Sequence, residues 1–236
     1  MSTSLLRQLP NALTIGNGLA GVGAVLLFFN ALATNQFITG TQLAFALIAL
    51  GVLCDTVDGP LARWLQVNNA MGAQLDSLCD GATFGVATAL VLGASLWSWS
   101  PVLAFLLASW WLTAVLLRLA RFNVETDTAT AHLYFSGLCS PVAALFITAV
   151  LAASAGSVAF PWVPLACALL LPALMLSRLV FADLPKHYLA KRRSPLELVI
   201  TALAMLVVSP AIAVSGFLSY FVLQSLLANL RGKAHA

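Results

Sequence analysis

Long runs of apolar residues alternate with short polar stretches along this chain. A helix needs about twenty consecutive apolar residues to cross a bilayer. We predict eight such helices, at 12–33, 41–66, 72–97, 101–122, 139–158, 161–182, 195–209 and 212–230. The last two are short and flank Pro210, so seven spans remain an alternative. The pattern therefore predicts an all-α, multi-pass membrane fold.

The composition supports a membrane protein and excludes an ordinary soluble domain. Of 236 residues, 61% are hydrophobic and only 8% are charged, with a mean hydropathy of +0.98. A soluble domain carries about 25% charged residues. The net charge of +3 is uninformative as a total, and the placement of the charges matters more. We expect no nucleic-acid partner.

The basic residues indicate how the helices are oriented. With eight spans, every Lys and Arg falls at one end of the spans, and the opposite loops near 34–40, 98–100, 159–160 and 210–211 carry no charge. Cytoplasmic loops of membrane proteins are enriched in Lys and Arg. Both termini are therefore expected in the cytoplasm, and a bacterial inner membrane is the expected location. The polar stretches at 122–137 and 183–195 are too short for soluble domains, so residues 1–236 are interpreted as one membrane domain.

Four aspartates interrupt the second and third predicted spans. The chain holds only eight acidic residues, and half of them lie between positions 55 and 80. A carboxylate inside a membrane is costly and usually has a partner or a function. Asp55 and Asp58 are spaced i,i+3 and Asp76 and Asp80 are spaced i,i+4, so each pair lies on one helix face. Two such helices, packed together, would form the oxygen-rich site that hard divalent cations prefer.

These residues fit a known signature. The pattern Asp-x2-Asp-Gly-x2-Ala-Arg-x8-Gly-x3-Asp-x3-Asp resembles that of the CDP-alcohol phosphotransferases, and it is complete here at Asp55, Asp58, Gly59, Ala62, Arg63, Gly72, Asp76 and Asp80. The resemblance implies a six-helix core, at about 8–182, with the helices at about 195–230 as an addition. It also implies a homodimer that transfers a substituted phosphate from a CDP-linked donor to an alcohol and releases CMP.

The resemblance assigns roles to the aspartates. Asp55, Asp58 and Asp76 would bind metal, and Asp80 would both bind a second ion and act as general base. The expected cofactors are two divalent ions, Mg²⁺ or Mn²⁺. Paired divalent ions polarise phosphoryl oxygens and stabilise the charge on a leaving group.

Other motif positions suit the nucleotide donor. Gly59 and Gly72 leave room for a close approach to the backbone, and Ala62 lies between them in the motif. Arg63 offers a planar, permanently charged fork for phosphate. Asn17, near the start of the first span, is a further candidate for contact with the nucleotide, whereas Asn11 is predicted to cap that helix.

Four further segments bear on the acceptor. Residues 10–21, 75–87, 118–124 and 134–141 resemble the membrane-embedded branch of the family that uses CDP-diacylglycerol as donor and L-serine as acceptor. The products would be phosphatidylserine and CMP, and membrane lipids would surround the site. Two positions depart from that branch, because Cys139 and Thr88 stand where its members commonly have proline. Both departures bear on the shape of a pocket rather than on the aspartates.

Arg118 and Arg121 are spaced i,i+3 at a cytoplasmic helix end. They are candidates to hold the phosphatidyl phosphate or the serine carboxylate, since guanidinium forks suit both groups. The alternative is an ordinary one, in which helix-end arginines reach toward anionic lipid head groups.

Several alternatives stay open at the level of sequence. The aspartates could join helices or pair with arginines, as Asp58 with Arg63. The same chemistry could use glycerol 3-phosphate, inositol phosphate or choline as acceptor. A cation-coupled transporter would use the aspartates as a relay, but the charges are confined to one half of both spans. The last alternative is a catalytically inactive protein that binds the CDP-lipid.

Overall fold

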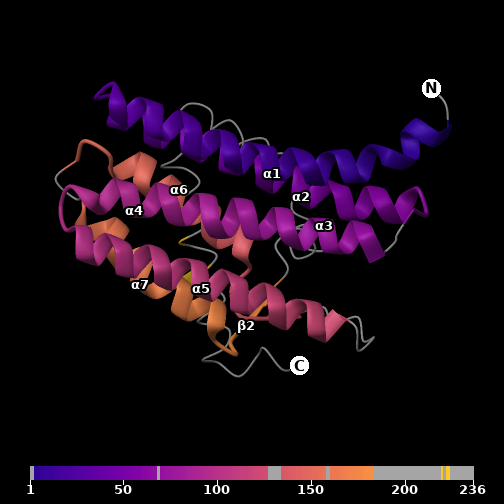
Figure 1. Ribbon diagram of the computed structural model, residues 1–236. Helices are drawn as coiled ribbons and strands as arrows, with labels where there is room; N and C mark the ends of the chain where they lie inside the picture. Colours follow the sequence, from indigo (N-terminus) through magenta and orange to yellow (C-terminus); the bar gives the residue numbers. More distant parts are fainter. Residues whose placement is uncertain are drawn as a thin grey trace, which may run out of the picture.

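A computed structural model describes residues 3–67, 70–126, 134–157 and 160–182, together with residues 219, 222 and 223. Its elements are α1 (Thr3–Ala33), α2 (Phe37–Trp64), α3 (Ala70–Asp80), the π-helix η1 (Gly81–Ala87), α4 (Thr88–Trp97), α5 (Pro101–Thr126), α6 (Ser140–Ser154) and α7 (Trp162–Leu176), with the short strands β1 (Tyr134–Ser136) and β2 (Val180–Ala182). The helices run roughly parallel or antiparallel to one another (Figure 1).

The first four predicted spans are confirmed as long apolar helices. Four helical stretches in the described part of the chain are long and apolar enough to cross a membrane: Arg7–Ala33, Phe37–Trp64, Ala70–Trp97 and Pro101–Val124. The third combines α3, η1 and α4 without a break. Large apolar side chains such as Leu19, Val102 and Leu170 are more than 60% exposed. Lipid tails would cover such a surface, which supports an integral membrane protein.

The fifth and sixth predicted spans are helical but shorter than predicted. α6 and α7 have 15 residues each. The helix predicted to reach residue 182 ends at Leu176, because Ser177 adopts an extended conformation and Val180–Ala182 pairs antiparallel with Tyr134–Ser136. This small pair of strands is an addition to the all-α expectation. The predicted helices at 195–209 and 212–230 lie outside the described residues, apart from Ser219, Val222 and Leu223, which are helical.

The packing brings the aspartate-bearing helices together. α1 packs along α2 and also contacts α3 and η1, while α5 packs against α4, η1 and α7. The start of α1, the end of α2, the start of α3 and the end of α5 lie at the same end of the bundle (Figure 1). The core at the centre is apolar, and its largest fully buried side chains include Phe28, Ile48, Phe84, Leu92 and Trp111.

The π-helix η1 follows Asp80 directly and changes the hydrogen bonding of the third span. The backbone N–H of Thr88 donates to the carbonyls of Gly85 and Thr83 rather than to that of Phe84. The Phe84 carbonyl instead accepts a 2.9 Å hydrogen bond from Nε1 of the buried Trp111 on α5. A π-turn therefore opens the ladder of α3 and α4 where a neighbouring helix supplies the missing donor.

Candidate metal and nucleotide site

The signature residues lie on two helices that are consecutive in the chain. The second half of α2 carries Asp55, Asp58 and Gly59, and α3 carries Gly72, Asp76 and Asp80. Because residues three or four apart share a helix face, each helix presents its two carboxylates on one side. α1 packs against both helices and supplies polar side chains of its own.

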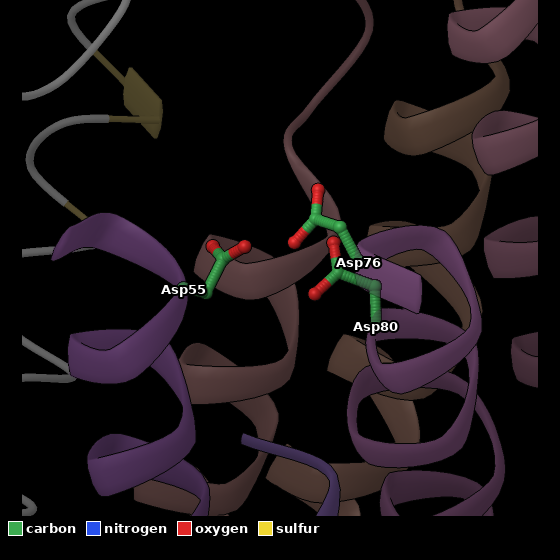
Figure 2. Close-up of side chains that lie close together, drawn as sticks. All are labelled: Asp55, Asp76 and Asp80. Atoms are coloured by element: carbon green, nitrogen blue, oxygen red, sulfur yellow. The ribbon is translucent and has the colours of Figure 1, made fainter. Parts of the chain in front are cut away.

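Three of the aspartates form a compact group, which we call the carboxylate cluster. One carboxylate oxygen from each of Asp55, Asp76 and Asp80 lies within 4.8 Å of the others. Figure 2 shows Asp55 on one helix facing Asp76 and Asp80 on another, with the carboxyl groups directed toward the space between them. Oδ1 of Asp76 is buried and has no hydrogen-bond partner among the described residues. This geometry brings Asp55 of one predicted pair together with both members of the other, Asp76 and Asp80.

Asp58 lies outside the carboxylate cluster, so the four carboxylates do not converge on one point as the spacing suggested. Its side chain is 6% exposed. The Thr14 hydroxyl lies 2.7 Å from Oδ2 of Asp58 and 3.0 Å from the Pro10 carbonyl, so it can donate to either group. Within the described part of the chain no ion pair joins Asp58 to Arg63, whose side chain is exposed. The carboxylate of Asp58 is thus held by α1 rather than by an arginine.

A cleft of about 410 Å³ opens beside the carboxylate cluster, and we call it the motif cleft. Its walls come from the start of α1, the end of α2 and the start of α3. The lining residues are Pro10, Asn11, Thr14, Asp58, Gly59, Ala62, Arg63, Val67, Gly72, Ala73 and Asp76. Six of the eight signature positions therefore line one cavity, and the other two, Asp55 and Asp80, belong to the carboxylate cluster without lining the cavity.

Asn17 and Asn11 have different surroundings from those predicted. Asn17 is fully buried, and its Nδ2 donates a 2.9 Å hydrogen bond to Oδ1 of Asp80. It therefore contacts the carboxylate cluster and is not among the residues that line the motif cleft. Asn11 is not a helix cap, because α1 begins at Thr3 and continues through Pro10, and Asn11 instead lines the cleft.

The two candidate arginines on α5 differ in environment. Arg118 is only 8% exposed, and its Nη1 donates a 2.9 Å hydrogen bond to the Ser140 hydroxyl. Its Nε has no hydrogen-bond partner among the described residues, and its charge acts electrostatically on Asp55. Arg121 is exposed and makes a long contact, 3.5 Å, with the Leu176 carbonyl. Burial close to the aspartates thus singles out Arg118.

The two departures from the serine-using branch fall at structured positions. Thr88 is buried, and its hydroxyl donates a 3.0 Å hydrogen bond to the Thr83 carbonyl at the end of η1. Cys139 immediately precedes α6 in an extended conformation, and its side chain makes no capping hydrogen bond. Neither side chain belongs to the carboxylate cluster.

The sequence pattern did not predict the contacts of Thr14, Thr83 and Ser140. One signal for Thr14 was available, because Asn11, Thr14 and Asn17 are spaced by three residues and form a polar stripe on an otherwise apolar helix. The hydroxyls of Thr83 and Ser140 gave no comparable signal, since single Thr and Ser residues are common in membrane helices.

Comparisons with known proteins agree with the signature. The sequence model of the CDP-alcohol phosphatidyltransferase family matches residues 7–171. A Mycobacterium tuberculosis protein named CDP-diacylglycerol–serine O-phosphatidyltransferase is 37% identical over 151 residues, which cover 62% of this chain and 50% of that protein. Proteins of the same name from Saccharomyces cerevisiae and Bacillus subtilis are 34% and 30% identical, over 58% and 57% of this chain and 52% and 73% of their own lengths. The chain thus spans about half the length of the mycobacterial and yeast relatives.

Proposed function

Because the chain belongs to the CDP-alcohol phosphatidyltransferase family, we propose that it transfers the phosphatidyl group of CDP-diacylglycerol to L-serine, giving phosphatidylserine and CMP. The observation that carries the proposal is the carboxylate cluster beside a cleft lined by the remaining signature residues. The relatives named for this reaction support serine as the acceptor. The family match alone supports the class of reaction.

The carboxylate cluster fits divalent metal ions. Its donors are all carboxylate oxygens, the type of ligand that Mg²⁺ and Mn²⁺ prefer, and Asp76 retains a buried oxygen with no hydrogen bond from the described residues. Asp55, Asp76 and Asp80 would hold the metal, with Asp58 as a further ligand at the wall of the cleft. Two bound ions would polarise the phosphoryl oxygens of the donor and stabilise charge on the departing CMP.

The motif cleft is the proposed seat of the CDP group. The signature glycines, Gly59 and Gly72, line it without side chains, so the nucleotide can approach the backbone. Ala62 adds only a methyl group, and Arg63 supplies a cation for the pyrophosphate. The diacylglycerol tails would extend from this cleft into the surrounding lipid.

Asp80 is the proposed general base. It would take the proton of the serine hydroxyl as the oxygen attacks the phosphorus that carries diacylglycerol, and the bond from that phosphorus to CMP would break in the same displacement. General bases act within hydrogen-bond reach of the proton they remove. The position of Asp80 in the carboxylate cluster, 8% exposed, keeps bulk water from competing for this role.

Arg118 is the proposed partner of the acceptor carboxylate. It is a buried guanidinium close to the carboxylate cluster, and only one of its nitrogens has a described hydrogen bond. A planar fork with open donor positions suits a carboxylate. Arg121, which is exposed, would bind an anionic lipid head group or the donor phosphate.

The proposal includes a topology. The start of α1, the end of α2, the start of α3 and the end of α5 lie at one end of the bundle (Figure 1). Four described basic residues belong to these segments: Arg7, Arg63, Arg118 and Arg121. We place that end in the cytoplasm of a bacterial inner membrane, with eight spans, both termini inside and two copies forming a homodimer. Cysteine accessibility labelling at 34–36 and 98–100 would test the orientation, and the mass of the detergent-solubilised particle would test the dimer.

The deciding experiment measures CMP release by the purified full-length chain. The reactions contain CDP-diacylglycerol and Mn²⁺ or Mg²⁺, with and without L-serine, and the lipid product is identified by mass. Serine-dependent release with phosphatidylserine as product supports the whole proposal. Release only with glycerol 3-phosphate, inositol phosphate or choline keeps the reaction class and rejects serine. No release with any alcohol, together with cation flux in proteoliposomes, would support a transporter.

A further inference from the structure

The hydrogen bond from Asn17 to Asp80 crosses between two helices that are far apart in the sequence. Asn17 lies on α1, is fully buried, and donates from Nδ2 to Oδ1 of Asp80 at 2.9 Å. An amide donor of this kind fixes which way a carboxylate faces, because the charged oxygen follows the N–H group. Asn17 is not one of the eight signature positions, so the signature does not assign this contact.

The position of Asn17 is itself set by a second contact. The hydroxyl of Thr83 donates a 2.8 Å hydrogen bond to the backbone carbonyl of Asn17. Thr83 is fully buried in η1, one turn after Asp80, and its own carbonyl accepts a 3.0 Å bond from the Thr88 hydroxyl. The same short segment of the third span thus holds Asn17 at its backbone through Thr83 and meets its side chain at Asp80.

Two glycines leave the space that these side chains occupy. A Cβ at Gly51 on α2 would lie 2.9 Å from Oδ1 of Asn17 and 3.1 Å from Cγ2 of Thr83. A Cβ at Gly21 on α1 would lie 2.6 Å from the Thr83 hydroxyl oxygen and 2.8 Å from its Cα. The amide is therefore enclosed by three helices, which leaves it little freedom to rotate away from Asp80.

We infer that Asn17 is a positioning residue that orients the carboxylate of Asp80 within the carboxylate cluster, and that Thr83 and Gly51 keep Asn17 in place. The inference deepens the proposed function and rests on it for the role of Asp80. Groups that hydrogen-bond to a metal-binding carboxylate orient it, and their loss typically reduces metal affinity or activity by about 10- to 100-fold. Asn17 acts through Asp80 and need not touch the substrate.

A purely structural role for Asn17 makes a different prediction. Interhelical hydrogen bonds between polar side chains also hold membrane helices together. If that were the only role, substitution would lower thermal stability while the surviving folded protein bound metal and turned over normally. A positioning role instead weakens Mn²⁺ binding and lowers kcat in protein that is still folded.

The test measures Mn²⁺ binding to the full-length protein without any lipid substrate, from the electron paramagnetic resonance signal of free Mn²⁺. The variants are Asn17→Leu, which nearly keeps the shape, and Gly51→Ala, which leaves the amide intact but removes its space. Matched controls are Asn30→Ala, an exposed asparagine on the same helix, and Gly23→Ala, where a Cβ would lie 3.4 Å from a flexible Leu47 methyl. Melting temperature, kcat and both KM values are recorded alongside.

Both test variants should raise the dissociation constant for Mn²⁺ and lower kcat by about 10- to 100-fold, with the KM for CDP-diacylglycerol changed much less. The controls should match the wild type. The inference is overturned if the wild type binds no Mn²⁺, or if Asn17→Leu binds it as tightly as the wild type. If Mn²⁺ binding falls as expected but the wild type releases no CMP with any alcohol, the proposed function fails while the positioning of Asp80 stands.

Discussion

Nη1 of Arg118 on α5 donates a 2.9 Å hydrogen bond to the hydroxyl of Ser140, the first residue of α6. Ser140 is fully buried and Arg118 nearly so, which fixes one edge of the guanidinium and leaves Nε unpaired among the described residues. A buried cation next to a group of carboxylates stabilises that group electrostatically. The arrangement also leaves a donor available for a second anion.

Arg118→Lys should raise the KM for L-serine by about tenfold or more, because lysine keeps the charge but loses the planar fork. The KM for CDP-diacylglycerol should change much less, and the melting temperature should remain close to that of the wild type. Steady-state kinetics with each substrate varied in turn provide the measurement. If neither KM changes, Arg118 serves the aspartates or the lipid rather than the acceptor.

Asp80→Asn should reduce turnover by at least about 100-fold, since an amide cannot accept the hydroxyl proton of the acceptor. Binding of CDP-diacylglycerol should remain measurable, because the motif cleft is lined by other residues. Equilibrium binding of the labelled donor and CMP release from the same preparation provide the comparison. Loss of donor binding together with turnover would mean that Asp80 acts mainly as a metal ligand.

Thr14→Val should raise the KM for CDP-diacylglycerol by about tenfold. The change removes the hydroxyl that can donate to Asp58, and hydrogen bonds to charged groups contribute about 1.5–3 kcal/mol. Thr148→Val is the matched control, because Thr148 is also buried and its described hydrogen bonds go to backbone carbonyls of its own helix. Equal effects of the two substitutions would point to a loss of packing rather than to the Asp58 contact.

The parts of the fold that follow from local pattern could be predicted. The lengths of the apolar runs predicted the ends of the first four spans to within five residues, because burial of backbone polar groups in lipid leaves the helix as the available structure. α6 and α7 were predicted too long, since Ala155 and Ser177 leave the helical conformation and β1 pairs with β2 after α7, which hydropathy does not report.

The candidate site was predictable only where spacing on one helix decides it. The i,i+3 and i,i+4 spacings predicted that each pair of aspartates shares one face of its helix. In the structure Asp55 of the first pair lies close to Asp76 and Asp80 of the second. Asp58 lies outside the cluster and contacts the Thr14 hydroxyl of α1 instead. That contact depends on how α1, α2 and α3 are rotated relative to one another, which the sequence does not reveal. The π-helix after Asp80 coincides with a contact from another helix, in which Trp111 donates to the Phe84 carbonyl, and spacing within one helix does not predict such a contact.

Gly21→Ala should destabilise the protein by about 1–3 kcal/mol, the usual cost of forcing an extra methyl group into a packed interior. The added Cβ would meet Thr83 at its Cα as well as at its hydroxyl, so no side-chain rotation can relieve the clash and α1 must move away from η1. Gly23→Ala, two residues further along the same helix, is the control, because its Cβ would meet only the end of Leu47. Thermal unfolding in detergent measures the difference, and equal melting temperatures for the two variants would contradict the close contact between α1 and η1.

Trp111→Phe should lower stability by about 1–2 kcal/mol and should also slow turnover. The substitution leaves the buried Phe84 carbonyl without its donor, and a stranded buried acceptor costs about 1–3 kcal/mol. The Phe84 carbonyl lacks a backbone donor only because η1 is π-helical. Loss of the Trp111 hydrogen bond therefore favours a return of η1 to α-helical bonding, in which the backbone would supply the donor. Such a change in register would rotate Asp80 relative to Thr83 and Asn17.

Trp110→Phe is the control, since Trp110 is more exposed and makes only a 3.4 Å contact with the Leu169 carbonyl. A loss of stability in Trp111→Phe without any change in kcat would show that the third span keeps its register without this bond.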